Sequence, residues 1–151
     1  MNLYLVRHGE ALTPDINPER PLSSIGISNI KKVATSLKED GVKVDTIFYS
    51  TKKRAKETAL ILAEKLNPTT LVEKQGLNPN NSIEIILEEI FGATDNLMIV
   101  GHLPFLRILT EKLLSDSKKK DFPTIKPGSV LSLSKNGDEW TLIKFISPDL
   151  I

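Results

Sequence analysis

The chain has 151 residues, of which 40% are hydrophobic and 26% are charged, a composition typical of a globular domain. Its 20 Lys and Arg side chains nearly cancel its 19 Asp and Glu side chains, which argues against a general binder of nucleic acids or membrane surfaces. Cysteine is absent, so disulfides, thiolate catalysis and cysteine-rich metal sites are excluded.

Strand and helix patterns alternate along the chain. Apolar runs predict strands, and apolar residues at helical spacing predict helices. The predicted strands span residues 2–6, 42–50 and 96–102, the predicted helices span 21–41, 51–66, 82–92 and 103–114, and residues 129–146 form a hairpin. This order predicts an α/β fold, a three-layer sandwich whose mostly parallel sheet is flanked by helices, with the C-terminal antiparallel hairpin at one edge. We expect one domain over residues 1–151.

Polar residues and glycines mark the ends of several elements. Ser23 or Ser24 is predicted to cap the first helix, and Gly41 to end it. Ser50 is predicted as the N-cap of the second helix. Asn136-Gly137 is predicted to form the type I′ turn of the hairpin.

Two features bear on the compartment. No apolar run approaches the roughly 20 residues that would cross a bilayer. The N-terminus lacks a basic stretch followed by a long apolar one, so no signal peptide is indicated. We therefore expect a cytoplasmic protein that does not bind membranes.

Basic side chains follow three strands at the point where each strand ends. Arg7 and His8 follow the first strand, and Arg54 lies in the first turn of the helix after the second. His102 ends the third strand, and with His8 it makes up all the histidine in the chain. Because ligands of open α/β sheets bind beyond the carboxyl ends of the parallel strands, we expect these four residues to form one site.

Such a cluster fits an oxyanion, and a phosphoryl group in particular. Arginine presents a planar fork of donors that matches phosphate oxygens, and helix N-termini add partial positive charge. No acidic cluster accompanies these residues, so we expect no metal and no cofactor. Neighbouring arginines should lower the pKa of His8 and keep its imidazole neutral, as a nucleophile toward phosphorus must be. The residues alone leave open which histidine attacks, and on which substrate.

Four segments, "VRHGEA", "PLSSIG", "YSTKKRAKETA" and "IVGHLPF", together resemble the histidine phosphatase superfamily, which has the phosphoglycerate mutase-like fold. Within it the sequence is most similar to the short SixA-type phosphohistidine phosphatases. The resemblance implies that His8 is the nucleophile and becomes transiently phosphorylated. It implies that Arg7 and Arg54 bind the phosphoryl oxygens and that His102 donates to one of them. Arg20, in Arg20-Pro21-Leu22, resembles an additional arginine at the mouth of the phosphate site.

One segment departs from the family pattern. Where relatives with sugar or glycerate substrates usually supply an acidic residue in a Glu-Leu-x-Pro block, this chain has Gly76-Leu77-Asn78-Pro79. An alcohol leaving group needs a proton from such an acid. A phosphohistidine needs it less, because its imidazole ring protonates near neutral pH. For Glu10, we expect a role in orienting an arginine rather than in donating a proton.

These patterns predict a metal-independent phosphatase that hydrolyses protein phosphohistidine through a covalent intermediate on His8. Its expected partner is a phosphorylated protein, and the absence of a lid insertion favours a site open enough to admit one. Two alternatives stay open. One is a phosphomonoesterase of the same superfamily that acts on a small phosphorylated metabolite. The other is a non-catalytic phosphate-binding module.

Overall fold

The fold is built on one six-stranded mixed sheet, seen in a computed structural model that describes residues 1–151. The strands are β1 (Asn2–Arg7), β2 (Thr46–Tyr49), β3 (Thr70–Glu73), β4 (Leu97–Gly101), β5 (Val130–Asn136) and β6 (Glu139–Ile146). Their order across the sheet is β3-β2-β4-β1-β5-β6. The first four strands in that order run parallel, and the β5–β6 hairpin adds an antiparallel edge beside β1. The predicted fold class is confirmed.

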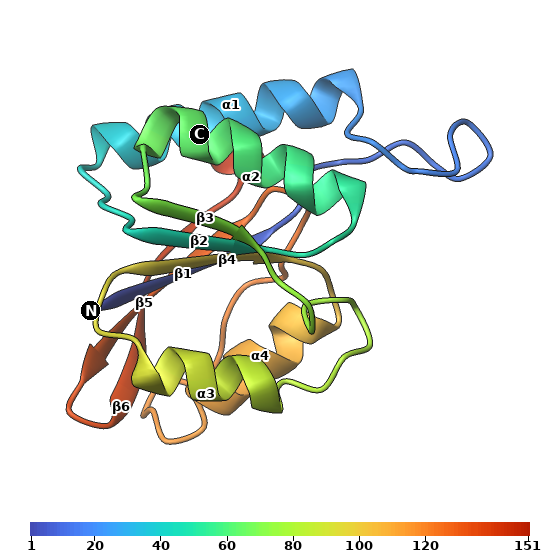
Figure 1. The fold of residues 1–151 in the computed structure, drawn as a ribbon. Coiled ribbons are helices and arrows are strands. Elements are labelled where there is room, and N and C mark those ends of the chain that lie inside the picture. Colours follow the sequence, from blue (N-terminus) through green and yellow to red (C-terminus); the bar gives the residue numbers. More distant parts are fainter.

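Helices cover both faces of the sheet (Figure 1). They are α1 (Ser24–Glu39), α2 (Lys53–Leu66), α3 (Glu84–Gly92) and α4 (Phe105–Leu113), followed at the C-terminus by a short 3-10 helix (Pro148–Leu150). The helices α1 and α2 lie on one face and α3 and α4 on the other. No helix is both long enough and apolar enough to cross a bilayer.

The two faces of the sheet carry separate hydrophobic cores because successive strand residues point to opposite sides. In β1, Leu3 and Leu5 pack in the core under α3 and α4, whereas Tyr4 and Val6 pack under α1 and α2. The strand β4 is buried throughout and divides its side chains in the same way. A strand buried on both faces reads as a continuous apolar run, as the first and third predicted strands do.

Two local predictions were wrong, and one strand was missed. The strand β3 was not predicted, because it has four residues and three of them are exposed. Ser50 does not cap α2, because that helix begins two residues later than predicted and Lys52 occupies the N-cap. The hairpin turn is centred on Gly137-Asp138, since Asn136 pairs with Glu139, and only Gly137 has a positive φ. A type I′ turn would need two such residues.

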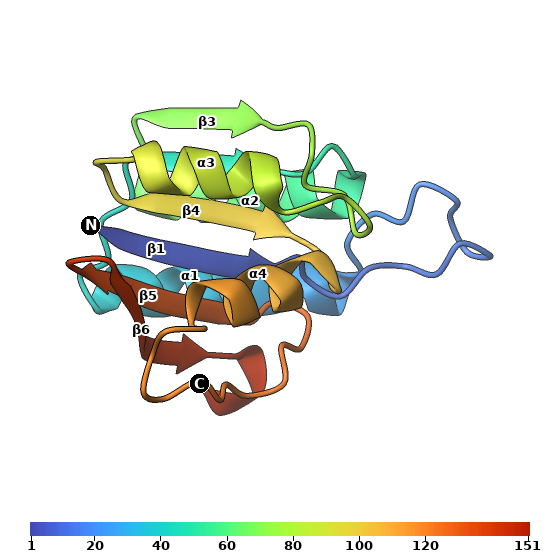
Figure 2. The same cartoon turned by 90° about the horizontal axis from the view of Figure 1, so that it is seen from below.

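A long connection projects from the carboxyl edge of the sheet, between β1 and α1 (Figures 1 and 2). We call residues 11–22 of this connection the arm. An antiparallel bridge between Ala11 and Leu22 closes its base, and the Leu12 amide donates to the Pro21 carbonyl oxygen at 2.8 Å. After the arm, Ser23 caps α1 as predicted, its hydroxyl oxygen accepting from the Gly26 amide.

Candidate active site

The ends of β1 and β4 bring the two histidines together. These strands are adjacent and parallel, with Arg7 in register with Gly101, so His8 and His102 follow neighbouring strand ends. Their ring centroids lie 5.1 Å apart, with the ring planes at 57°. Both side chains are buried, His8 with 7% and His102 with 1% of its surface exposed. The sequence places its two histidines far apart, and the fold makes them one pair.

A single hydrogen bond defines the reactive nitrogen of His8. Its Nδ1 lies 2.7 Å from the carbonyl oxygen of Gly9. A carbonyl oxygen only accepts, so Nδ1 carries the proton and Nε2 keeps its lone pair. The Gly9 amide in turn donates to the Thr58 hydroxyl of α2 at 3.0 Å, which ties this loop to a helix. The neutral ring therefore has a free lone pair on Nε2.

Both imidazoles are held neutral. Burial, followed by the charges of Arg54, Arg7 and Arg20, lowers the pKa of His8 to about 4, against the opposing effect of its hydrogen bond to Gly9. Burial, then the neighbouring His8 and nearby cations, lowers the pKa of His102 to about 3. The predicted effect of the arginines on His8 has the correct sign, but burial is the larger cause.

Arg7 and Arg54 each have a buried hydrogen-bond donor without a partner. One terminal nitrogen of Arg7 donates to the carbonyl oxygen of Ile125 at 2.8 Å, but its buried Nε has no partner. The buried Nε of Arg54 also has none, and neither arginine belongs to an ion pair. Burial lowers the pKa of both arginines. Because an unpaired buried donor costs about 1–3 kcal/mol, donors gathered in this way fit an anionic ligand.

The start of α2 places Arg54 beside the histidine loop. Thr58 donates its hydroxyl proton to the Arg54 carbonyl oxygen one turn back, at 2.8 Å, while accepting from Gly9. The first turn of α2 contains no acidic residue, although negative charge is what a helix N-terminus normally favours. Basic residues at this end of a helix are better explained by an anion bound nearby.

Arg20 reaches the same site from the arm. Its backbone adopts the left-handed conformation, with φ at 51°, and its Nε donates to the carbonyl oxygen of Leu12 at 3.1 Å. The charge of Arg20 contributes to lowering the pKa of both His8 and Arg54. The structure thus brings all five predicted site residues to one edge of the sheet, with Arg20 contributed by the arm.

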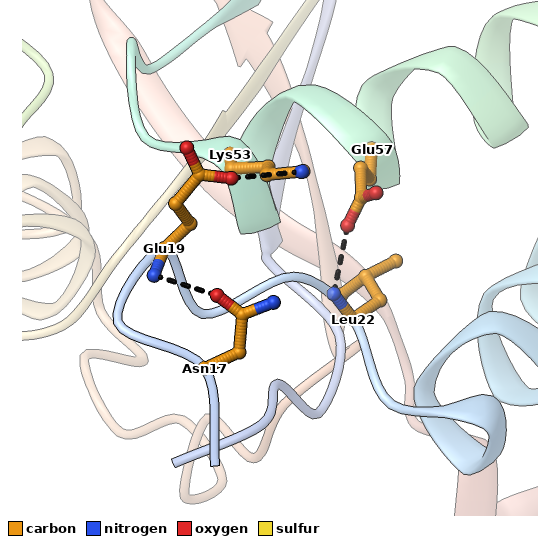
Figure 3. Close-up of polar contacts among 5 residues, drawn as sticks. All are labelled: Asn17, Glu19, Leu22, Lys53 and Glu57. Atoms are coloured by element: carbon orange, nitrogen blue, oxygen red, sulfur yellow. Dashed lines mark hydrogen bonds and ion pairs between the residues drawn. The ribbon is translucent and has the colours of Figure 1, made fainter. Parts of the chain in front are cut away.

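Contacts with α2 hold the arm in place (Figure 3). The Glu57 carboxylate accepts from the amide of Leu22 at 2.7 Å, and Lys53 forms an ion pair with Glu19 at 3.1 Å. Within the arm, Asn17 accepts from the amide of Glu19 through its side chain and from the amide of Arg20 through its backbone carbonyl. The arm that carries Arg20 is therefore fastened to the helix that carries Arg54.

Ser50 and Glu10 lie differently from what the sequence predicted. The hydroxyl of Ser50 lies 2.8 Å from Nε2 of His102 and 3.1 Å from the side-chain oxygen of Asn78. Glu10 does not orient an arginine, because its carboxylate accepts from the Ser23 hydroxyl at 2.6 Å. The contacts of Asn78, Thr58 and Ile125 were missed from the sequence, because no local sequence pattern indicates them.

Gly76, the residue at which the sequence departs from the family pattern that it resembles, has a φ of 87°. A side chain there would meet nothing within 4 Å, so strain, not crowding, disfavours one. No group of three or more His, Asp or Glu side chains is arranged to hold a metal ion. The cluster combines two neutral imidazoles with several arginines, and a neutral nucleophile beside positive groups is what phosphoryl transfer requires of a protein.

Comparison with known proteins identifies the family. Residues 3–79 match the model of the histidine phosphatase superfamily, branch 1. The chain is 39% identical to an uncharacterised protein of Picosynechococcus sp. over 70% of this chain and 68% of that protein. It is 26% identical to phosphohistidine phosphatase SixA of Escherichia coli over 91% of this chain and 89% of that protein. The chain belongs to the histidine phosphatase superfamily and is a SixA-like phosphatase within it.

Solved structures share the fold but differ in their substrates. The protein histidine phosphatase SixA in complex with tungstate superposes with a TM-score of 0.86 at 21% identity, covering 99% of both chains. The α-ribazole phosphatase of Shigella flexneri gives 0.75 at 17% identity, covering 98% of this chain and 97% of that one. A phosphoserine phosphatase variant from Entamoeba histolytica gives 0.71 at 16% identity and 97% of both chains. The fold alone therefore leaves the substrate open.

Proposed function

We propose that this chain, acting as one domain over residues 1–151, hydrolyses phosphohistidine in a protein through a phosphorylated intermediate on His8, without a metal or another cofactor. The observation that carries the choice of substrate is Gly76, a residue with no proton to give at the position where relatives with alcohol leaving groups carry an acid. Phosphohistidine leaves as an imidazole and needs such an acid less.

In the first step Nε2 of His8 forms a bond to phosphorus while the P–N bond of the substrate breaks. The substrate's imidazole leaves as a neutral ring, because its other nitrogen already carries a proton when the P–N bond breaks. Arg7 and Arg54 hold the equatorial oxygens of the phosphoryl group, His102 donates to one of them once protonated, and Arg20 binds at the mouth. Groups preorganised in this way act where charge develops, and one such donor is worth about 10²–10³ in rate.

In the second step water forms a bond to phosphorus and the bond to Nε2 of His8 breaks, releasing inorganic phosphate. The water gives up its proton to solvent, and His8 returns to its neutral form. Burial and the surrounding arginines favour that form, because they lower the pKa of His8 to about 4. The same residue is thus ready for the next turnover near neutral pH.

The test compares substrates on wild type and His8→Ala. Turnover of a phosphohistidine-containing protein is measured beside a panel of sugar phosphates and p-nitrophenyl phosphate, in metal-free buffer. We expect wild type to prefer the phosphohistidine protein, and His8→Ala to lose at least about 10³-fold in rate.

Two other outcomes would change the proposal. If sugar phosphates are preferred while His8→Ala is inactive, the nucleophile stands and the argument from Gly76 fails. If nothing is turned over but inorganic phosphate still binds, the chain is a phosphate-binding module. The neutral imidazole of His8, among the other basic residues, favours hydrolysis over binding alone, since a binding module has no need of a neutral nucleophile.

A further inference from the structure

Asn78, Ser50 and His102 form a chain of hydrogen bonds that the proposed reaction leaves unexplained. Nε2 of His102 lies 2.8 Å from the hydroxyl oxygen of Ser50, and that hydroxyl lies 3.1 Å from Oδ1 of Asn78. His102 and Ser50 are almost wholly buried, at 1% and 0% exposure. Water therefore does not compete for the bond between His102 and Ser50, while the bond from Ser50 to Asn78 is partly buried.

The direction of the chain follows from the partners of Asn78. Its Oδ1 accepts from the hydroxyl of Ser50 and also from that of Thr51, at 3.4 Å. A serine hydroxyl has one proton to donate. When that proton goes to Asn78, the proton between Ser50 and His102 must come from Nε2 of His102. The backbone amide of Asn78 donates to the side chain of Asn81 at 2.8 Å, which fixes the segment that carries it.

The two histidines are then opposite tautomers. His8 carries its proton on Nδ1, bonded to the Gly9 carbonyl, and keeps the lone pair on Nε2. His102 carries its proton on Nε2, bonded to Ser50, and keeps the lone pair on Nδ1. That Nδ1 is buried and has no hydrogen-bond partner. The same is true of the Nε atoms of Arg7 and Arg54.

We propose that Asn78 is a positioning residue which acts through Ser50 to hold His102 in its Nε2–H tautomer, leaving Nδ1 free to take up a proton and donate it to a bound phosphoryl oxygen. The phosphoryl step rests on the proposed function. In it Nδ1 gains a proton from solvent when the phosphoryl dianion binds, and returns it to solvent when phosphate leaves. Only N–H bonds form and break at His102. In the other tautomer Nδ1 already carries a proton, but Nε2 accepts from Ser50 and the ring stays neutral, so its bond to the phosphoryl oxygen lacks the positive charge that strengthens such a bond.

The tautomers are measured directly by long-range ¹H–¹⁵N correlation spectra of the imidazole rings, in which N–H and lone-pair nitrogens resonate far apart. The chain has only two histidines, and a His8→Gln spectrum assigns them. We expect Nδ1–H for His8 and Nε2–H for His102 in the free wild-type protein near pH 7. An Nδ1–H pattern for His102 would overturn the proposal, whether or not the protein turns over any substrate.

Variants at Asn78 test the positioning role. In Asn78→Ala the Ser50 hydroxyl is free to donate to Nε2, so His102 should shift toward Nδ1–H, and kcat for p-nitrophenyl phosphate should fall about tenfold with a smaller change in KM. Asn78→Asp keeps an oxygen that accepts from Ser50 and should restore the wild-type tautomer and most of kcat. Thr51→Val is the matched control, because Thr51 also donates to Asn78 but does not touch His102.

The two proposals fail separately. An unchanged His102 tautomer in Asn78→Ala, or an unchanged kcat despite a changed tautomer, overturns the role of Asn78 and leaves phosphatase activity untouched. If wild type turns over none of the substrates, the proposed function is overturned, while the spectra still decide the tautomer of His102. If Asn78→Ala does not fold, the wild-type spectrum and the Asn78→Asp variant carry the test.

Discussion

At the scale of single residues, the hydrogen bond from Nδ1 of His8 to the Gly9 carbonyl decides which nitrogen is free to react. We expect the phosphorylated intermediate to be the Nε2 isomer. The reaction with p-nitrophenyl phosphate is quenched in alkali during turnover. The peptide that carries the phosphoryl group is then mapped by mass spectrometry, and ³¹P NMR distinguishes the Nε2 from the Nδ1 isomer.

The His102→Gln variant is the control, because it keeps the nucleophile and should still become labelled on His8, more slowly by about 10²–10³-fold. A label on His102, or on Nδ1 of His8, would contradict the assignment. His8→Ala should give no label at all.

The basic residues of the site were predictable from sequence, but their partners were not. Arg7, His8 and His102 stand out because they follow apolar runs that end at one edge of a parallel sheet. Ser50 lies 52 residues from His102 and 28 from Asn78, so no local spacing reveals their contacts. A serine before a helix is typical of an N-cap, and here tertiary packing gives it another use.

At the scale of elements, the first turn of α1 packs directly on the loop after His8. A Cβ on Gly26 would lie 2.1 Å from the backbone carbonyl oxygen of Glu10, and one on Gly9 would lie 2.8 Å from Ile30. We expect Gly26→Ala to displace this loop, lower the free energy of unfolding by about 1–3 kcal/mol and reduce kcat. Urea denaturation and steady-state kinetics measure the two effects.

Gly92→Ala is a matched control in another helix. A Cβ there meets nothing within 4 Å, and alanine favours helix over glycine by about 0.5–1 kcal/mol. Gly92→Ala should therefore leave kcat unchanged and not destabilise the protein. Equal destabilisation by both substitutions would show that the close approach of Gly26 to Glu10 is not what makes alanine unfavourable there.

The arm offers a second prediction at this scale. Glu57→Ala removes the acceptor for the amide of buried Leu22 and loosens the base of the arm that carries Arg20 (Figure 3). A lost hydrogen bond to a charged group is worth about 1.5–3 kcal/mol, so we expect KM for p-nitrophenyl phosphate to rise about tenfold or more.

The control for the arm is Glu19→Gln, which breaks only an ion pair between exposed side chains. Such pairs contribute about 0–1 kcal/mol, so KM should change by less than about fivefold. If Glu19→Gln raises KM as much as Glu57→Ala, the ion pair between Lys53 and Glu19 holds the arm as firmly as the contact at its base does. If neither raises KM, Arg20 does not bind substrate.

At the scale of the whole molecule, the alternation of buried strands and amphipathic helices is what made the fold predictable. Leu3 and Leu5 on one face and Tyr4 and Val6 on the other need cover on both sides, and the helices supply it. The exposed edge strand β3 has no such requirement, and so left no signal in the sequence. The hydrophobic pattern specifies the layers but not the polar contacts at their edge.

Two buried neutral histidines make the stability of the whole molecule depend on pH. Burial lowers the pKa of His8 to about 4 and of His102 to about 3, from an ordinary 6.5 that the unfolded chain regains. Between these values the unfolded state binds protons that the folded state does not, so the free energy of unfolding falls as pH falls. Each histidine adds a slope of up to about 1.4 kcal/mol per pH unit, and this penalty is absent above the unfolded pKa.

Urea unfolding of wild type and of the His8→Gln/His102→Gln double variant, between about pH 5 and about pH 7, isolates this effect from the carboxylates that titrate at lower pH. Wild type should lose stability over this range more steeply than the double variant, whose glutamines bind no proton. Parallel curves would mean that the histidines are solvated in the folded state. In that case the imidazole of His8 would be protonated below about pH 6.5, and its competence as a nucleophile would be confined to a higher pH than the buried geometry implies.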